Sequence, residues 1–257
     1  MNLIMVLYGV GESKELIASL KKRGYQVAAV VQTEYGGQAA ESSGADRVFS
    51  VLPGNDDISK LIQTLGIKLM IDATHPFVNP LSTEAQEKSL SFTIPYIRFG
   101  RSETNLPQNS LIHRVNSWEK AAETASSFNG TIFLTTGSHN LDVFTKCKDL
   151  SGRRIVVRVL PDPRILRICQ EQGIIPRDIV AMQGPFSVKL NKAIFQAYRT
   201  GVVVTRDGGL AGGTYNKVNA ALNLKIPVVL IQREKLVEKN CLLDLDRLLE
   251  NVARNYR

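Results

Sequence analysis

Hydrophobic runs alternate with amphipathic stretches through the first hundred residues. Residues 3–8 form a continuous apolar run, and in the segment that follows, residues 12–22, Leu16, Ile17 and Leu20 share one helical face. A buried strand is therefore expected to lead directly into a helix. Because each parallel strand needs a crossover before the next, repeated alternation of this kind predicts a parallel sheet flanked by helices. The other strands of this half are expected at residues 27–31, 47–51, 68–71 and 94–99, and the other helices at residues 58–65 and 79–91.

The same alternation restarts beyond residue 110. Residues 100–110 between the two halves are rich in polar side chains and include Pro107, as expected of a hinge. We therefore predict an α/β chain of two Rossmann-like, doubly wound domains, residues 1–100 and 101–257, with a cleft between them. The terminal helix, residues 242–252, could pack on either domain. Strands are expected at residues 111–115, 131–134, 154–160, 179–182, 202–205 and 228–231, and helices at residues 117–128, 163–172, 187–198 and 215–222.

Composition narrows the class of protein. The 257 residues are 44% hydrophobic and 22% charged, which is ordinary for a globular protein. No apolar run approaches the roughly 20 residues of a membrane-spanning helix, and the N-terminal segment lacks the features of a signal peptide, so a cytoplasmic protein is expected. Cys147, Cys169 and Cys241 are widely spaced and form no Cys-x-x-Cys pair, so neither a disulfide framework nor a metal site is predicted.

The net charge of +8 favours an anionic partner. The lysines and arginines are scattered, however, and form no basic stripe interleaved with aromatic residues. A small polyanionic ligand is therefore favoured over nucleic acid.

A glycine-rich turn joins the first predicted strand to the first helix. Gly9, Val10, Gly11 and Glu12 lie where a dinucleotide's pyrophosphate would meet backbone N–H groups and the positive end of the helix dipole. The dinucleotide fingerprint is incomplete because Lys14 takes the place of its third glycine. A tight strand-to-helix turn without a ligand would also explain the pattern.

Thr33 and Glu34 follow the second strand. Glu34 lies about 25 residues after Gly9, close to where an acidic side chain would bind a ribose 2′-hydroxyl. No Lys or Arg lies between Val31 and Asp46, whereas a 2′-phosphate would require a cation. The pattern therefore favours NADH over NADPH.

Asp72, Thr74 and His75 follow the strand at residues 68–71, at the sheet edge where doubly wound folds bind ligands. Pro76 pushes His75 out of the helical region, which would leave the imidazole in an extended segment. Alternatively, Asp72 and Thr74 could cap the next helix while His75 satisfies a hydrogen bond in the core.

Two loops of the second half combine glycines with hydroxyl groups and charges. Thr135, Thr136 and Gly137 follow one strand, and Arg206 and Asp207 follow another. Lys217 comes shortly afterwards, beyond a second pair of glycines. A polyanion is bound by this combination of N–H donors and cationic side chains.

Taken together, four segments resemble the precorrin-6A reductase family of cobalamin biosynthesis, including its cobalt-precorrin-6A branch. They are IDATHPF at residues 71–77, FLTTG at 133–137, QGPFS at 183–187 and the glycine-rich run at 204–234. The resemblance covers nearly the whole chain. The family's opening Gly-Gly-Thr-Gly-Glu falls on residues 8–12, where Tyr8 and Val10 depart from it.

The resemblance implies a nicotinamide nucleotide on the N-terminal glycine turn and an anionic tetrapyrrole in the cleft. It also implies an NAD(P)H-dependent oxidoreductase that transfers hydride to one CH–CH double bond of the macrocycle. TEYGG at residues 33–37 is similar to the cobalt branch, for which NADH is expected and NADPH remains possible. Neighbouring pathway enzymes are possible partners, and no membrane or nucleic-acid partner is expected.

Within this hypothesis the candidate residues take three roles. His75 would supply a proton or polarise the macrocycle, oriented by Asp72 and accompanied by Thr74. Gly9 to Glu12, with Thr33 and Glu34, would bind the nucleotide. Substrate binding is assigned to Thr135, Thr136, Gly137, Arg206, Asp207 and Lys217.

Two other functions stay open. One is a different Rossmann-type small-molecule oxidoreductase, although no Tyr-x-x-x-Lys pair follows a suitable helix. The other is a non-catalytic protein that binds a nucleotide or a tetrapyrrole.

Overall fold

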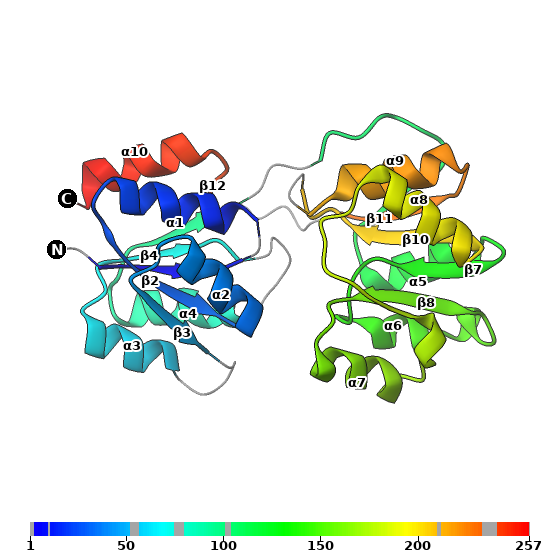
Figure 1. Ribbon diagram of the computed structural model, residues 1–257, viewed down its shortest axis with the longest axis horizontal. Coiled ribbons are helices and arrows are strands. Elements are labelled where there is room, and N and C mark those ends of the chain that lie inside the picture. Colours follow the sequence, from blue (N-terminus) through cyan, green and yellow to red (C-terminus); the bar gives the residue numbers. More distant parts are fainter. Residues whose placement is uncertain are drawn as a thin grey trace. The chain divides into compact units, whose positions relative to one another are not determined.

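The computed structural model describes residues 3–9, 11–51, 57–74, 80–100, 104–209, 212–232 and 241–256. The chain divides into two compact units, residues 1–102 with 235–257 and residues 103–234. Each unit is built around its own six-stranded parallel sheet (Figure 1). We refer to them as the first and second units.

The first unit has the strand order β12-β5-β4-β1-β2-β3. The chain runs outward from β1 to β3 and then crosses to β4 on the other side of β1, so the order reverses between β1 and β4. The strands are β1 (Leu3–Leu7), β2 (Gln26–Val31), β3 (Arg47–Ser50), β4 (Leu69–Asp72), β5 (Tyr96–Phe99) and β12 (Cys241–Leu242), and the helices are α1 (Glu12–Lys22), α2 (Glu34–Ser42), α3 (Asp57–Leu65), α4 (Pro80–Ser91) and α10 (Leu245–Asn255).

The second unit repeats this arrangement with the order β6-β11-β10-β7-β8-β9, which reverses between β7 and β10. Its sixth strand, β6, precedes the other five in the chain, whereas the sixth strand of the first unit, β12, follows the other five. The strands are β6 (Ile112–Val115), β7 (Thr131–Leu134), β8 (Ile155–Val159), β9 (Ile179–Ala181), β10 (Thr200–Arg206) and β11 (Val228–Ile231), and the helices are α5 (Trp118–Ser126), α6 (Leu141–Thr145), α7 (Pro163–Glu171), α8 (Val188–Ala197) and α9 (Thr214–Asn223), with short 3-10 turns at Lys148–Leu150 and Pro176–Asp178.

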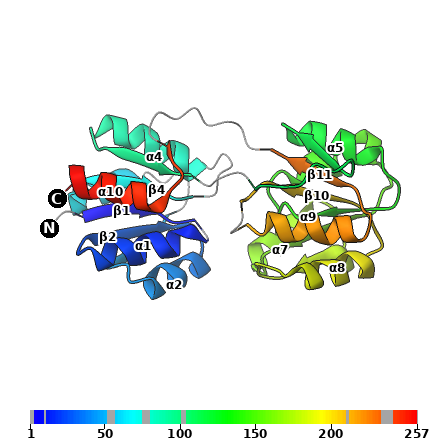
Figure 2. The same ribbon diagram turned by 90° about the horizontal axis from the view of Figure 1, so that it is seen from above.

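Helices cover both faces of each sheet, as the apolar runs predict. In β1, Ile4 and Val6 pack with α1 and α10, whereas Met5 and Leu7 pack with α3 and α4. All five residues of β1 are buried because each face is covered. In the second unit α8 and α9 lie on one face and α5 on the other (Figure 2). The prediction of parallel, doubly wound sheets is confirmed.

Helices α2 and α6, strand β12 and the two short 3-10 turns were not predicted from the sequence. Helix α2 contains Gly36 and Gly37, which lower its helical propensity, and β12 is only two residues long. The terminal helix α10 packs on the first unit through Leu248, Leu249 and Val252. No helix among the described residues is both long and apolar enough to cross a bilayer.

Candidate functional site

The loops predicted to bind ligands follow the strands on either side of each point where the strand order reverses. In open α/β sheets, ligands bind outside the carboxyl ends of the strands at such a switch point. In the first unit this point lies between β1 and β4, and in the second unit it lies between β7 and β10.

Gly9 is required by the packing of two loops in the first unit. A Cβ atom on Gly9 would lie 2.2 Å from the carbonyl oxygen of Ala73, which follows β4. The N–H of Gly9 donates to Ser13 Oγ at 2.9 Å, and Ser13 Oγ donates to that same carbonyl of Ala73 at 3.2 Å. The Gly9 amide is therefore already used inside the protein, and Ser13 joins the glycine turn to the end of β4.

Gly11 is the N-cap residue of α1, with φ 99° and ψ −107°, a backbone conformation accessible only to glycine. Glu12, the first residue of α1, is half-buried. The backbone N–H groups of this first turn and the positive end of the helix dipole remain the features suited to a phosphate. Val10 lies outside the described residues.

Thr33 and Glu34 occupy the start of α2. Thr33 Oγ1 accepts a hydrogen bond from the N–H of Gly36 at 3.0 Å, so Thr33 serves as the helix cap. Glu34 is the first residue of α2 and is exposed. Glu34 thus lies just beyond the carboxyl end of β2, where a ribose would be bound.

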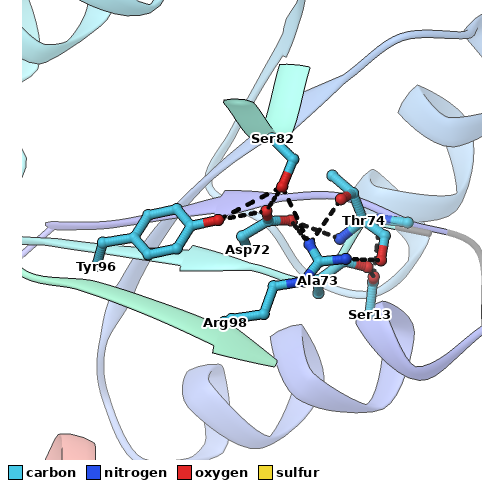
Figure 3. Close-up of polar contacts among 8 residues, drawn as sticks. Ser13, Asp72, Ala73, Thr74, Ser82, Tyr96 and Arg98 are labelled. Atoms are coloured by element: carbon cyan, nitrogen blue, oxygen red, sulfur yellow. Dashed lines mark hydrogen bonds and ion pairs between the residues drawn. The ribbon is translucent and has the colours of Figure 1, made fainter. Parts of the chain in front are cut away.

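Asp72, the last residue of β4, is the centre of a buried polar network (Figure 3). Its carboxylate forms an ion pair with Arg98 and accepts a hydrogen bond from Ser82 Oγ. It also accepts from Tyr96 Oη at 2.6 Å and from the N–H of Thr74 at 2.8 Å. Burial and the neighbouring carboxylate of Asp72 raise the pKa of Tyr96, so the phenol stays a hydrogen-bond donor.

Arg98 of β5 connects this network to Thr74. Its Nη1 donates to Thr74 Oγ1 at 2.8 Å and its Nη2 to the Thr74 carbonyl at 3.3 Å. The network therefore fixes both the side chain and the backbone of the residue before His75. His75 lies outside the described residues, so its orientation by Asp72 stays a prediction.

Sequence reasoning missed the partners of Asp72. Tyr96 and Arg98 stand two residues apart in a strand and so point to the same face of the sheet. Two polar side chains on one face of a mostly buried strand were the available signal. Ser13 and Ser82 had no local signal because their partners lie far away in the sequence.

In the second unit, the predicted residues after β7 serve partly to join strands. Thr135 donates to the carbonyl of Val204 in β10 from its backbone N–H at 2.8 Å and from its Oγ1 at 3.1 Å. Thr136 is buried, and Gly137 has a φ of 80°. The turn at the second switch point is thus tied across to β10.

Asp207 holds the loop that follows β10. It accepts hydrogen bonds from Thr104 N at 3.0 Å, from Thr104 Oγ1 at 2.6 Å and from Gly209 N at 3.0 Å. A small cavity of about 250 Å³ lies beside these groups and is also lined by Arg114 and Gln232.

Arg158 of β8 was not predicted as a site residue. It is 7% exposed, and its Nη1 donates to Asn191 Oδ1 at 2.8 Å. Its guanidinium carbon lies 4.2 Å from the centre of the Phe186 ring, within the QGPFS segment. Ser187 of the same segment caps α8, its Oγ accepting from the N–H of Leu190 at 3.2 Å, which is the ordinary role for a serine at that position.

Lys217 in α9 is influenced by two arginines. Burial, followed by the charges of Arg158 and Arg206, lowers the pKa of Lys217 to about 7, against an opposing effect of Asp207. Burial and Arg206 also lower the pKa of His139, which follows the β7 turn. Arg158 of β8, Arg206 of β10 and Lys217 of α9 are therefore close enough at this edge of the second sheet to influence one another's charge.

No group of three or more histidine, cysteine, aspartate or glutamate side chains suited to a metal ion occurs within the described ranges.

Comparison with known proteins identifies the family. The family model described as precorrin-6x reductase CbiJ/CobK matches residues 3–253. The cobalt-precorrin-6A reductase of Priestia megaterium is 35% identical over 91% of this chain and 91% of its own length. That of Methanocaldococcus jannaschii is 31% identical over 98% of each chain. A solved structure titled CobK precorrin-6A reductase shares the fold, with a TM-score of 0.77 and 21% identity over 99% of this chain and 97% of its own. The chain therefore belongs to the precorrin-6x reductase family.

Proposed function

We propose that this protein is a cobalt-precorrin-6A reductase of cobalamin biosynthesis. The observation that carries the proposal is the family match, which spans residues 3–253 and so includes both switch-point edges. The two edges differ in a way that suits two ligands. The first has a glycine turn at a helix N-terminus, and the second gathers cations.

The first unit fits a nicotinamide nucleotide. Its strand order is that of dinucleotide-binding domains, and Gly11 provides the required turn at the start of α1. The N–H groups of the first turn of α1 would hold the pyrophosphate, while the Gly9 amide stays with Ser13. The nucleotide, when bound, supplies the hydride.

NADH is the proposed nucleotide. Glu34 lies exposed beyond β2 and suits a ribose 2′-hydroxyl, which a carboxylate can bind as an acceptor. No Lys or Arg lies between Val31 and Asp46, and Arg47 opens β3, which runs parallel to β2, so that Arg47 lies toward the opposite edge of the sheet. A 2′-phosphate would therefore meet a carboxylate and no nearby cation from this segment.

Reduction of a carbon–carbon double bond needs a proton for one carbon in addition to the hydride for the other. We assign the proton, or polarisation of the macrocycle, to His75. Asp72 and Thr74 act in this proposal by fixing the strand end that leads to His75, because Arg98 holds both of them. On the second unit, Arg206 and Lys217 bind carboxylates of the tetrapyrrole.

An anaerobic single-turnover reaction with cobalt-precorrin-6A tests the proposal. Nicotinamide fluorescence and tetrapyrrole absorption are followed together, once with NADH and once with NADPH. Coupled loss of both signals is expected. A tetrapyrrole spectral shift with neither nucleotide consumed would refute the reductase and select a non-catalytic binding protein.

His75→Ala is expected to lose turnover while its affinity for NADH, measured by fluorescence, stays unchanged. His113→Asn is the matched control because His113 lies in edge strand β6 of the second unit, outside both candidate edges. Unchanged turnover in His75→Ala would overturn the assignment of the proton to His75.

A further inference from the structure

Two buried arginines of this chain are compensated in different ways. Arg98 in the first unit is 3% exposed and forms an ion pair with the fully buried Asp72. Arg158 in the second unit is 7% exposed, and the hydrogen bond found for it goes to the neutral side-chain amide of Asn191. Among the described residues, no ion pair includes Arg158 or Lys217. A buried charge without a counter-charge is unfavourable, so an anionic ligand would stabilise this position.

The charged residues around Arg158 are mostly positive as well. Lys217 feels both Arg158 and Arg206, and the one carboxylate that acts on it is Asp207. Asp207 already accepts three hydrogen bonds, two of them from Thr104. Lys217 is thus acted on by two arginines and by one carboxylate whose oxygens already accept other hydrogen bonds.

The guanidinium of Arg158 is held in a fixed position. Phe186 lies over it at 4.2 Å, and the Phe186 carbonyl accepts hydrogen bonds from Asn191 Nδ2 at 3.3 Å and Asn216 Nδ2 at 3.0 Å. Asn191 belongs to α8, and Asn216 precedes Lys217 in α9. The same segment is therefore fastened to both helices, and the planar fork of Arg158 is pre-organised for the two oxygens of a carboxylate.

Exposed apolar side chains lie at the same edge of the sheet. Leu160 follows β8, Met182 follows β9 and Tyr215 is in the first turn of α9, and all three are exposed. A ligand that joins carboxylates to a broad apolar ring would use both sets of side chains. A nucleotide phosphate would use only the cations.

We propose that Arg158 binds a peripheral carboxylate of the tetrapyrrole, and that Lys217 and Arg206 complete a three-cation pocket at the carboxyl edge of the second sheet. The choice of ligand rests on the proposed function.

Titration of cobalt-precorrin-6A without nucleotide, followed by its absorption spectrum, tests this pocket. Arg158→Gln removes the charge but keeps a donor for Asn191, and we expect its Kd to rise on the order of 10- to 100-fold. Arg158→Lys keeps the charge without the fork and should lie between Arg158→Gln and the unmodified protein. The matched control is Arg177→Gln, an exposed arginine of the second unit, which should change Kd by less than about twofold. The affinity for NADH should be the same in all of them.

A Kd of Arg158→Gln equal to that of Arg177→Gln overturns the proposal. So does a loss of NADH affinity with tetrapyrrole affinity retained, because the pocket would then hold a nucleotide phosphate. If Arg158→Gln fails to fold, Lys217→Gln replaces it and must weaken tetrapyrrole binding for the pocket to stand. Failure of the unmodified protein to reduce cobalt-precorrin-6A would instead refute the proposed function, which separates the two hypotheses.

Discussion

Replacing Asp72 by asparagine is expected to destabilise the first unit strongly. The carboxylate has four partners, Arg98, Ser82, Tyr96 and the N–H of Thr74. Asparagine keeps one acceptor oxygen but loses the charge. Arg98, which is 3% exposed, would then be left as a buried cation without its carboxylate.

The magnitude follows from burial. Breaking one side of a buried ion pair costs about 3–5 kcal/mol in the free energy of unfolding. The exposed pair Lys120 and Glu123, with side chains 55% and 60% exposed, offers a control of the same chemistry. Glu123→Gln should cost no more than about 0.5 kcal/mol. At roughly 4 °C per kcal/mol for a unit of this size, Asp72→Asn should lower Tm by about 12–20 °C.

Urea unfolding followed with two probes measures the effect. Far-UV circular dichroism reports helices of both units, whereas Trp118, the single tryptophan, belongs to the second unit. The circular dichroism midpoint should fall in Asp72→Asn with little change in slope. Tyr96→Phe removes the 2.6 Å hydrogen bond to Asp72 and the longer 3.4 Å contact with Ser82 Oγ, and it should cost about 1.5–3 kcal/mol.

The reasoning fails if Asp72→Asn shifts the circular dichroism midpoint no further than Glu123→Gln does. That result would mean that Arg98 reaches water or another counter-charge when the carboxylate is lost. A fall in the Trp118 transition as large as that in circular dichroism would show that the effect extends into the second unit.

Three further results are expected. Gly9→Ala should weaken NADH binding at least about tenfold, because the added Cβ would lie 2.2 Å from the Ala73 carbonyl oxygen. Gly37→Ala, in a helix with room for a methyl group, should leave NADH binding unchanged. Equal NADH affinities of the two variants in a fluorescence titration would contradict this. The Kd for the tetrapyrrole should rise as pH increases through about 7, because Lys217 attracts carboxylates only when protonated and its pKa, set by burial and by Arg158, Arg206 and Asp207, lies near 7. Lys217→Met should flatten this pH dependence of Kd. An unchanged pH dependence in that variant would exclude Lys217 as its source. Glu34→Arg should shift the ratio of kcat/KM from NADH toward NADPH by roughly tenfold in initial-rate assays, and a constant ratio would place the ribose elsewhere.

The sheets could be predicted because strands buried on both faces of a parallel sheet have continuous apolar sequences. Helix α2 could not, since Gly36 and Gly37 oppose a helix locally. Gly36 is buried, and an added Cβ would lie 3.2 Å from Thr33 Oγ1 and 3.5 Å from Val31, so close packing against the end of β2 favours glycine there. Strand β12 pairs with Arg98 and Phe99, far earlier in the chain, and only that pairing defines it.

The position of the candidate sites was predictable for a related reason. Parallel strands end at a common edge, so the residues that follow them can be placed there without coordinates. Their partners could not be found in this way. Thr74 meets Arg98 across 24 positions, Ala73 meets Ser13 across 60, and Asp207 meets Thr104 across 103. No local pattern encodes such pairs.

Arg98 and Arg158 look alike in the sequence but have different charge partners in the folded chain. Each is a lone arginine within a strand that is otherwise mainly apolar, YIRF in one case and IVVRV in the other. The sequence gives no reason to treat them differently. In the folded chain Arg98 meets a carboxylate, so its charge is balanced and its role is to hold Thr74. Arg158 meets an amide and acts on Lys217, and no described carboxylate pairs with it, so the proposed tetrapyrrole carboxylate would supply its counter-charge.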